Sequence, residues 1–250
     1  LAFAADGTLL ASMGDAASYE GIDAGSFSGT FYQQALIDGI IRPAENVGAF
    51  RSQMLNSMNG KLLRIDPATG DGLPSNPFYV PGQPRATKSR VYAFGLRNSF
   101  RIAVRPGTGS TDPSVGDIGE VYMGDVGFAS WEELNIVKAP GMNFGWPIYE
   151  GNEYTIPVGG GAGTTYNDLS VQNLDEPNPL YGTGGCTQQY FQFRQLVKQA
   201  NPDEDKTLYN PCNGSVPVGT GYRYYHNRPA LEWSHAHAWT RVGIFNGNNA

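Results

Sequence analysis

Residues 1–15 read LAFAADGTLLASMGD, and this stretch sets the expected fold. Apolar Leu1 and Phe3 alternate with small residues, Asp6-Gly7 follows as a turn signal, and a second apolar run covers 9–13. An apolar strand that enters a tight Asp-Gly turn and leaves as another strand is typical of a β-hairpin. We therefore expect short antiparallel strands here.

The same local pattern recurs along the chain without a strict period. Period-2 alternation bounded by turn residues predicts strands at 61–65, 91–94, 102–104, 121–123, 134–137, 222–225, 231–233 and 242–245. Only 31–41 and 50–58 have helix-like spacing of apolar residues. The pattern predicts an all-β domain spanning 1–250, and by itself it suits either the blades of a propeller or a sandwich.

The segment 151–218 has poor periodicity and is predicted to consist of long loop insertions. It contains Gly159-Gly160-Gly161 and the polar run 201–205. Loops of such length in a compact domain are usually functional or mobile, so we expect them to form the rim of a site.

The composition excludes several classes of partner. The chain has 33 Gly and 17 Pro in 250 residues, 40% hydrophobic and 12% aromatic residues, and a formal net charge of −6. The aromatic and aliphatic content supplies enough apolar area for a folded core. A negative net charge without a local cluster of Lys or Arg disfavours nucleic acid and anionic membranes as partners. No apolar run approaches the ~18 residues that a membrane span needs.

Cys186 and Cys212 are the two cysteines of the chain. A disulfide that pins the insertion is the favoured reading, and two buried free thiols are the alternative. A disulfide would place the protein in an oxidising compartment, extracellular or periplasmic.

Three polar residues follow predicted strands. Asp15, introduced by Gly14, either caps the next loop or orients a catalytic partner. Arg97 and Asn98 follow the strand at 91–94, where a guanidinium and an amide would suit carboxylate or quinone oxygens. An ordinary surface turn is the alternative for this pair.

Two further clusters could bind a metal. Asp125, Glu132 and Glu133 flank a glycine-containing loop of the kind that supplies calcium ligands, although a solvated acidic turn explains the spacing equally well. The three histidines, His226, His235 and His237, make zinc conceivable, but no Cys or carboxylate follows at a suitable spacing.

Taken in order, these motifs resemble the glucose/sorbosone dehydrogenase family. The resemblance covers roughly residues 1–151, and weakly 229–247. It rests on residues 1–15, Gly60-Lys61-Leu62-Leu63-Arg64-Ile65-Asp66, Gly95-Leu96-Arg97-Asn98, Gly124-Asp125-Val126-Gly127 through Asn135, Asn143-Phe144-Gly145-Trp146-Pro147 and Tyr149-Glu150-Gly151. It implies a six-bladed β-propeller that carries pyrroloquinoline quinone and calcium and oxidises a sugar hydroxyl. A length of 250 residues then corresponds to about two-thirds of one propeller, so we expect an incomplete propeller that is inactive on its own.

The resemblance also assigns roles to residues. Asp15 would orient a histidine base that lies a few residues before Leu1, and Arg97 would contact the quinone oxygens with Asn98 beside it. The carbonyls of Gly127 and Phe128 would hold the cofactor calcium, at a position where the glucose enzymes often have Pro in place of Phe128. Around a second, structural calcium the resemblance places Glu133, through its carboxylate, and Phe144, through its backbone.

Three functional classes follow from these features. The leading expectation is a quinone-dependent dehydrogenase that acts on a sugar and passes electrons to an acceptor. The second is a non-catalytic extracellular propeller that binds carbohydrate or protein, similar to the hedgehog-interacting relatives. A calcium-dependent lactonase is the third, but no set of carboxylates converging on an axis is evident.

Overall fold

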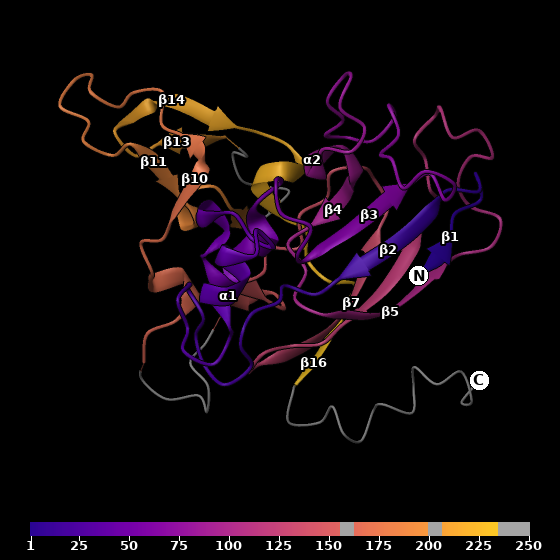
Figure 1. Ribbon diagram of the computed structural model, residues 1–250, viewed down its shortest axis with the longest axis horizontal. Coiled ribbons are helices and arrows are strands. Elements are labelled where there is room, and N and C mark those ends of the chain that lie inside the picture. The colour runs from indigo at the N-terminus through magenta and orange to yellow at the C-terminus, as the bar shows by residue number, and fades with distance from the viewer. Residues whose placement is uncertain (156–162, 200–206, 235–250) are drawn as a thin grey trace.

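The computed structural model describes residues 1–155, 163–199 and 207–234, and its regular structure is mostly β (Figure 1). Two four-stranded antiparallel sheets dominate it. The first contains, in spatial order, β1 (Ala2–Phe3), β2 (Leu9–Met13), β3 (Lys61–Ile65) and β4 (Val91–Phe94). The second contains β16 (Leu231–Ser234), β7 (Trp131–Val137), β6 (Val121–Asp125) and β5 (Ser99–Val104).

The two sheets lie next to each other, because β1 and β2 both contact β5. A shared core fills the space between them, formed by Leu10, Leu62, Tyr92, Val121, Met123 and Val137 with their neighbours. Alternation places Val121 and Met123 on the buried face of β6, as a period of two requires. A smaller cluster of Leu63, Val91 and Phe94 lies on the other side of β3 and β4, so these two strands are buried on both faces.

The expected all-β propeller class is confirmed. Each sheet is a four-stranded antiparallel meander of the kind that makes one propeller blade. The described residues form two such blades and so account for part of a six-bladed ring. The second blade is completed late in the chain, since β16 pairs with β7 after residues 138–230 have intervened.

Most predicted strands form, some with the predicted bounds and others longer. Those at 9–13, 61–65 and 91–94 have the predicted bounds, whereas 102–104, 121–123 and 134–137 are parts of the longer β5, β6 and β7. Pairing with β6 extends β5 toward residues 97–98, and the pairing of β6 with β7 extends both of these strands toward the loop between them. The strand predicted at 242–245 lies outside the described residues.

Three local predictions need correction. The helix predicted at 31–41 is confined to α1 (Tyr32–Ile37). The helix predicted at 50–58 is instead the 3₁₀ helix η2 (Gly48–Gln53). All six of its residues are buried, so the segment has no exposed face and is not amphipathic. The strand predicted at 222–225 is the 3₁₀ helix η5 (Tyr222–Tyr224) followed by β15 (Tyr225–His226). The other short helices are η1 (Pro43–Glu45), α2 (Thr87–Arg90), η3 (Tyr166–Asp168) and η4 (Phe193–Gln195).

The segment 151–218 is more regular than expected, because it contains two hairpins. β10 (Gln172–Pro177) pairs with β11 (Tyr190–Gln192), and β13 (Leu208–Asn210) pairs with β14 (Asn213–Gly219). Both hairpins lie at the end of the molecule opposite β1 (Figure 1). The remaining short pairs are β8 (Tyr149–Glu150) with β9 (Glu153–Tyr154), and β12 (Lys198–Gln199) with β15.

A disulfide between Cys186 and Cys212 joins the two hairpins and confirms the favoured pairing. The bond links residues 26 positions apart, with the Cα atoms 5.5 Å from each other. Closing a loop of this size restricts the unfolded chain and so stabilises the folded insertion.

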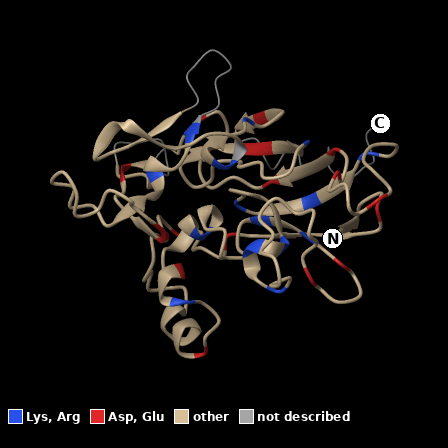
Figure 2. Ribbon diagram, turned by 90° about the horizontal axis from the view of Figure 1, so that it is seen from above, with Lys and Arg blue, Asp and Glu red and all other residues tan. Residues whose placement is uncertain are grey.

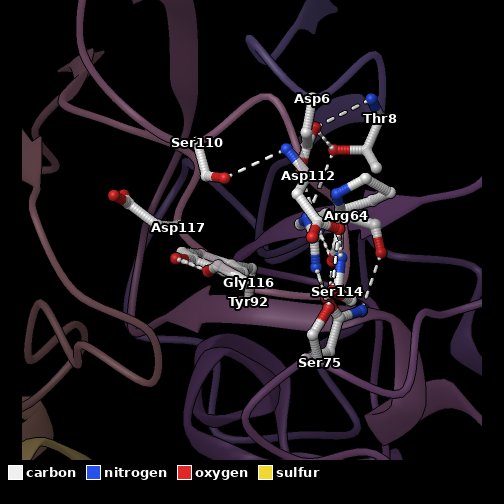
Figure 3. Close-up of polar contacts among 12 residues, drawn as sticks. Asp6, Thr8, Arg64, Ser75, Tyr92, Ser110, Asp112, Ser114, Gly116 and Asp117 are labelled. Carbon is white, nitrogen blue, oxygen red and sulfur yellow. Dashed lines mark hydrogen bonds and ion pairs between the residues drawn. The ribbon is translucent and has the colours of Figure 1, made fainter.

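Arg64 on β3 anchors the first blade from inside (Figure 3). Its side chain and that of Asp6 are fully buried and form an ion pair at 2.7 Å. The remaining guanidinium donors reach Thr8, Ser75, Asn76 and the carbonyl of Pro113. All five N–H groups of the arginine are thereby satisfied, which is what makes a buried charge tolerable.

Charged residues are dispersed over the described chain, and Figure 2 shows Lys and Arg scattered among Asp and Glu. Among the described residues, no helix is long and apolar enough to cross a membrane.

Candidate functional site

Three loops meet where the two blades join. Asp15 follows β2, Arg97 and Asn98 connect β4 to β5, and Gly127 and Phe128 connect β6 to β7. Backbone hydrogen bonds link the loops: Asp15 N donates to Arg97 O at 2.8 Å, and Val126 N donates to Asn98 O at 3.1 Å. The structure therefore brings together these five residues that the sequence singled out.

Asp125, at the end of β6, organises the connection between the blades. Its two carboxylate oxygens accept the backbone N–H groups of Arg97 and Asn98 at 3.0 and 2.6 Å. Burial raises the pKa of Asp125 to about 6, against the effect of these two donors. The side chain thus fixes the backbone at Arg97 and directs the guanidinium toward the neighbouring loop.

The Asp15 carboxylate is buried and held at both oxygens. One oxygen accepts the indole Nε1–H of Trp146 at 2.7 Å, and the other accepts the N–H of Ala17 at 3.1 Å. Arg51 holds the surrounding backbone by donating to the carbonyls of Asp15 and Ala16. Burial raises the pKa of Asp15, and the hydrogen bond from Ala17 opposes that rise. A carboxylate fixed in this way is suited to orienting a partner.

The guanidinium of Arg97 lies between two aromatic rings and two carbonyls. Its Nη1 donates to the carbonyl oxygens of Val126 at 2.9 Å and Gly127 at 2.7 Å. Its Cζ lies 5.5 Å from the ring centroid of Phe128 and 5.6 Å from that of Trp146. Cation–π attraction and the two carbonyls together hold the charge in a half-buried position.

The aromatic wall of the site includes Tyr166 as a third member. Trp146 and Tyr166 have ring centroids 5.3 Å apart, and Phe128 lies 5.8 and 5.9 Å from these two rings. The Tyr166 hydroxyl accepts the N–H of Asp23 at 3.0 Å, which fixes its ring. Such edge-to-face contacts make a rigid apolar surface next to Arg97.

The predicted acidic cluster separates onto two faces of β7. Glu132 accepts the N–H of Gly127 at 3.1 Å, whereas Glu133 accepts the N–H of Gly151 at 2.5 Å. Asp125 is the cross-strand partner of Glu133. Burial first, and then the nearby Asp125, raise the pKa of Glu133 well above its ordinary value. Each of these carboxylates serves as an acceptor for backbone amides.

Glu133 and Phe144 do not form a shared cluster of polar groups. The ring of Phe144 lies in the core between the blades, and its N–H donates to Phe94 O at 2.9 Å. Beside Glu133, the buried amide oxygen of Asn135 has no hydrogen-bond partner, an arrangement compatible with a cation. Among the described residues, however, no group of three or more His, Cys, Asp or Glu side chains could hold a metal. A calcium ion at Glu133 and Phe144 stays a prediction.

The histidines do not form a zinc site in the described part of the chain. His226 is completely buried, and its ring stacks on Tyr149 at 4.6 Å between centroids. Burial lowers the pKa of His226 to about 3, so it is neutral at physiological pH. His235 and His237 lie outside the described residues.

Sequence reasoning assigned no role to Trp146, Tyr166 or Glu150. Trp146 and Glu150 belong to motifs that carry the family resemblance, which was the available signal. Tyr166 lies in the segment predicted to be an insertion, and no local pattern marks it. Glu150 accepts the backbone N–H groups of 128–130 on one carboxylate oxygen, at 2.5, 3.0 and 3.1 Å.

The two four-stranded sheets, joined by a connection that carries a partly buried arginine, define an all-β protein of the propeller class. The family model described as Glucose / Sorbosone dehydrogenase matches residues 1–181. The chain therefore belongs to the glucose/sorbosone dehydrogenase family.

Individual relatives are distant and longer than this chain. The HIPL1 protein of Arabidopsis thaliana is 28% identical over 149 residues, which cover 52% of this chain and 19% of that protein. The PQQ-bound aldose sugar dehydrogenase of Streptomyces coelicolor is 27% identical with a TM-score of 0.37, covering 65% of this chain and 32% of that one. A putative glucose dehydrogenase of Thermus thermophilus is 26% identical with a TM-score of 0.39, covering 62% and 36%. The match spans about a fifth of the plant relative and about a third of each solved chain.

Proposed function

We propose that this chain is part of a dehydrogenase that oxidises a sugar hydroxyl with pyrroloquinoline quinone as cofactor. The observation that carries the proposal is the placement of the Arg97 guanidinium, held between Phe128 and Trp146 beside the Asp15 loop. A planar cation on an aromatic wall suits a planar, anionic quinone. When bound, the quinone would supply the acceptor for a hydride from the sugar carbon.

Each residue has a distinct role in this proposal. Arg97 donates hydrogen bonds to the quinone oxygens, where negative charge develops, and the exposed amide of Asn98 binds beside it. Asp15 is a positioning residue that orients a histidine base. We do not assign the base to Asp15 itself, because its carboxylate is buried and held in place by the N–H groups of Trp146 and Ala17.

The carbonyls of Gly127 and Phe128 are the proposed ligands of a cofactor calcium. The Gly127 carbonyl converges with that of Val126 on one cationic nitrogen of Arg97, which indicates that this loop favours positive charge. Carbonyl oxygens are the donors that calcium prefers. A second calcium is proposed at Glu133, through its carboxylate, and Phe144, through its backbone carbonyl.

The remaining parts of the proposal concern surroundings and partners. The disulfide favours an extracellular or periplasmic location. We expect a small sugar as substrate and a separate electron acceptor. The insertion 151–218 is proposed to form the rim of the site within a single partial propeller that spans 1–250.

A non-catalytic binding propeller is the second candidate. It is favoured by the hydrogen bond from Arg97 to the Gly127 carbonyl, because this bond gives both groups a partner within the protein. In this alternative the aromatic wall binds carbohydrate or protein, and Arg97 is structural.

Reconstitution separates the two candidates. The full-length protein is mixed with pyrroloquinoline quinone and calcium, and reduction of an artificial acceptor is followed with a panel of aldoses. We expect Arg97→Ala to abolish turnover, whereas Arg101→Ala, which removes an exposed arginine of β5, leaves it intact. Absence of turnover by the wild-type protein with every aldose would overturn the dehydrogenase proposal, and turnover unaffected by Arg97→Ala would overturn the catalytic role of this arginine.

A further inference from the structure

The loop between β6 and β7 presents carbonyls to one side and amides to the other. In a planar trans peptide the C=O and N–H groups point in opposite directions. Any group that holds an N–H in place therefore also directs the carbonyl of the same peptide. The peptides Val126–Gly127 and Gly127–Phe128 are each held in this way by a carboxylate.

Glu132 holds the first of these peptides. Its Oε2 accepts the N–H of Gly127 at 3.1 Å. The carbonyl of the same peptide, Val126 O, points away from Glu132 and accepts Arg97 Nη1 at 2.9 Å.

Glu150 holds the second peptide from β8. Its Oε1 accepts the N–H of Phe128 at 2.5 Å, and the carbonyl of that peptide, Gly127 O, accepts the same Arg97 Nη1 at 2.7 Å. Glu150 also accepts the N–H groups of Ala129 and Ser130 and the Ser130 hydroxyl, and only 2% of its surface is exposed. A proline at 128 would have no N–H for this bond.

Close packing behind the loop requires glycine at 127. A Cβ placed there would overlap the carbonyl oxygen of Trp131 and would lie 2.8 Å from Glu150 Oε1. The glycine thus permits Glu150 to approach the backbone, and through it sets the direction of the carbonyls.

We propose that Glu132 and Glu150 are positioning residues that direct the Val126 and Gly127 carbonyls to a single point and so create a cation cradle, occupied in this structure by the guanidinium of Arg97. Their negative charges behind the loop strengthen the attraction of the cradle for a cation. Entry of a hard cation requires Arg97 to leave. The use of this cradle in cofactor loading rests on the proposed function, but its geometry does not.

Nuclear magnetic resonance of the full-length, cofactor-free protein tests the geometry. Wild-type Arg97 is expected to show resolved guanidinium Nη signals, because its rotation is restrained by two carbonyls. Glu150→Ala should remove this signature and accelerate hydrogen exchange of amides 128–130 by roughly tenfold or more. Glu150→Gln, which keeps a carbonyl acceptor at the same place, should restore in part both the resolved Arg97 signals and the slow exchange of the amides. Glu153→Ala, which removes a nearby exposed carboxylate, should change neither.

The outcomes distinguish a failure of the cradle geometry from a failure of the proposed cofactor binding. If Glu150→Ala leaves the Arg97 signals unchanged, or if Glu150→Gln rescues nothing, the positioning role is wrong. If the signals respond as expected while the wild-type protein binds no quinone and no calcium by titration calorimetry, the proposed function is wrong. The positioning role of the two glutamates is then still supported. If wild type binds quinone, Glu150→Gln should weaken that binding roughly tenfold with little change in Tm.

Discussion

The indole Nε1–H of Trp146 donates to Asp15 Oδ2 at 2.7 Å, across 131 positions of sequence. This bond joins the loop after β2 to the segment before β8, and both residues are almost completely buried. A buried carboxylate that loses such a donor keeps the cost of leaving water without the compensating interaction.

Removing the indole donor should therefore destabilise the protein. Trp146→Phe is expected to lower the free energy of unfolding by about 2–4 kcal/mol, from the lost hydrogen bond and the smaller ring. A double-mutant cycle with Asp15→Ala, which removes the acceptor, isolates the bond when it is measured by urea unfolding. We expect a coupling energy of about 1.5 kcal/mol or more, and strictly additive effects would contradict a direct interaction.

The buried ion pair of Arg64 and Asp6 should be far more sensitive than an exposed one. Asp6→Ala leaves the guanidinium buried without its counter-charge, so we expect a loss of about 3–5 kcal/mol in unfolding free energy. The matched control is Asp71→Ala, which breaks the pair with Arg85, whose side chain is 72% exposed, and should cost less than about 1 kcal/mol. Equal losses in the two variants would show that burial does not decide the contribution.

The pH dependence of stability should include a contribution from His226. Burial lowers its pKa from 6.5 to about 3, so between these values the unfolded chain binds a proton that the folded protein does not. The contribution of His226 to the free energy of unfolding is complete above pH 6.5 and is lost as the pH falls toward 3. From pH 6.5 to 4.5 the loss is about 2–3 kcal/mol.

His226→Phe removes the titrating group and keeps a ring against Tyr149. The difference in unfolding free energy between wild type and variant should shift by the stated amount across this pH range, in chemical denaturation at fixed ionic strength. A constant difference from pH 6.5 to 4.5 would mean that His226 is protonated to the same extent in both states.

Loss of the disulfide should act mainly on the insertion. Replacing Cys186 and Cys212 together by Ser is expected to cost about 3 kcal/mol, from the loop of 26 residues that the bond closes. Limited proteolysis should show new cleavage within 172–219 before the blades are cut. Cleavage that begins in β5 or β6 would place the effect elsewhere.

Much of the fold could be predicted from local sequence. Short apolar runs bounded by turn residues identify β2, β3 and β4 with their correct bounds, because the core buries one side of β2 and both sides of β3 and β4. In η2 every residue is buried, so the spacing of apolar residues does not indicate the type of helix, and the predicted helix is a 3₁₀ segment. The hairpins of the insertion escaped prediction because the long strands β10 and β14 are mostly exposed or half-buried and carry few apolar residues.

For the site, the residue types at 15, 97 and 127 could be identified from the chain, but their partners could not. Glu132 and Glu133 are adjacent, and only their alternation on β7 in the folded sheet sends one to Gly127 and the other to Gly151. By itself the sequence determined most strands of the two blades and the candidate residues of the site, since both depend on local properties. The tertiary structure alone decided that Trp146 holds Asp15 and that Glu150 directs the carbonyls facing Arg97, because such contacts depend on how distant segments pack and leave no local pattern.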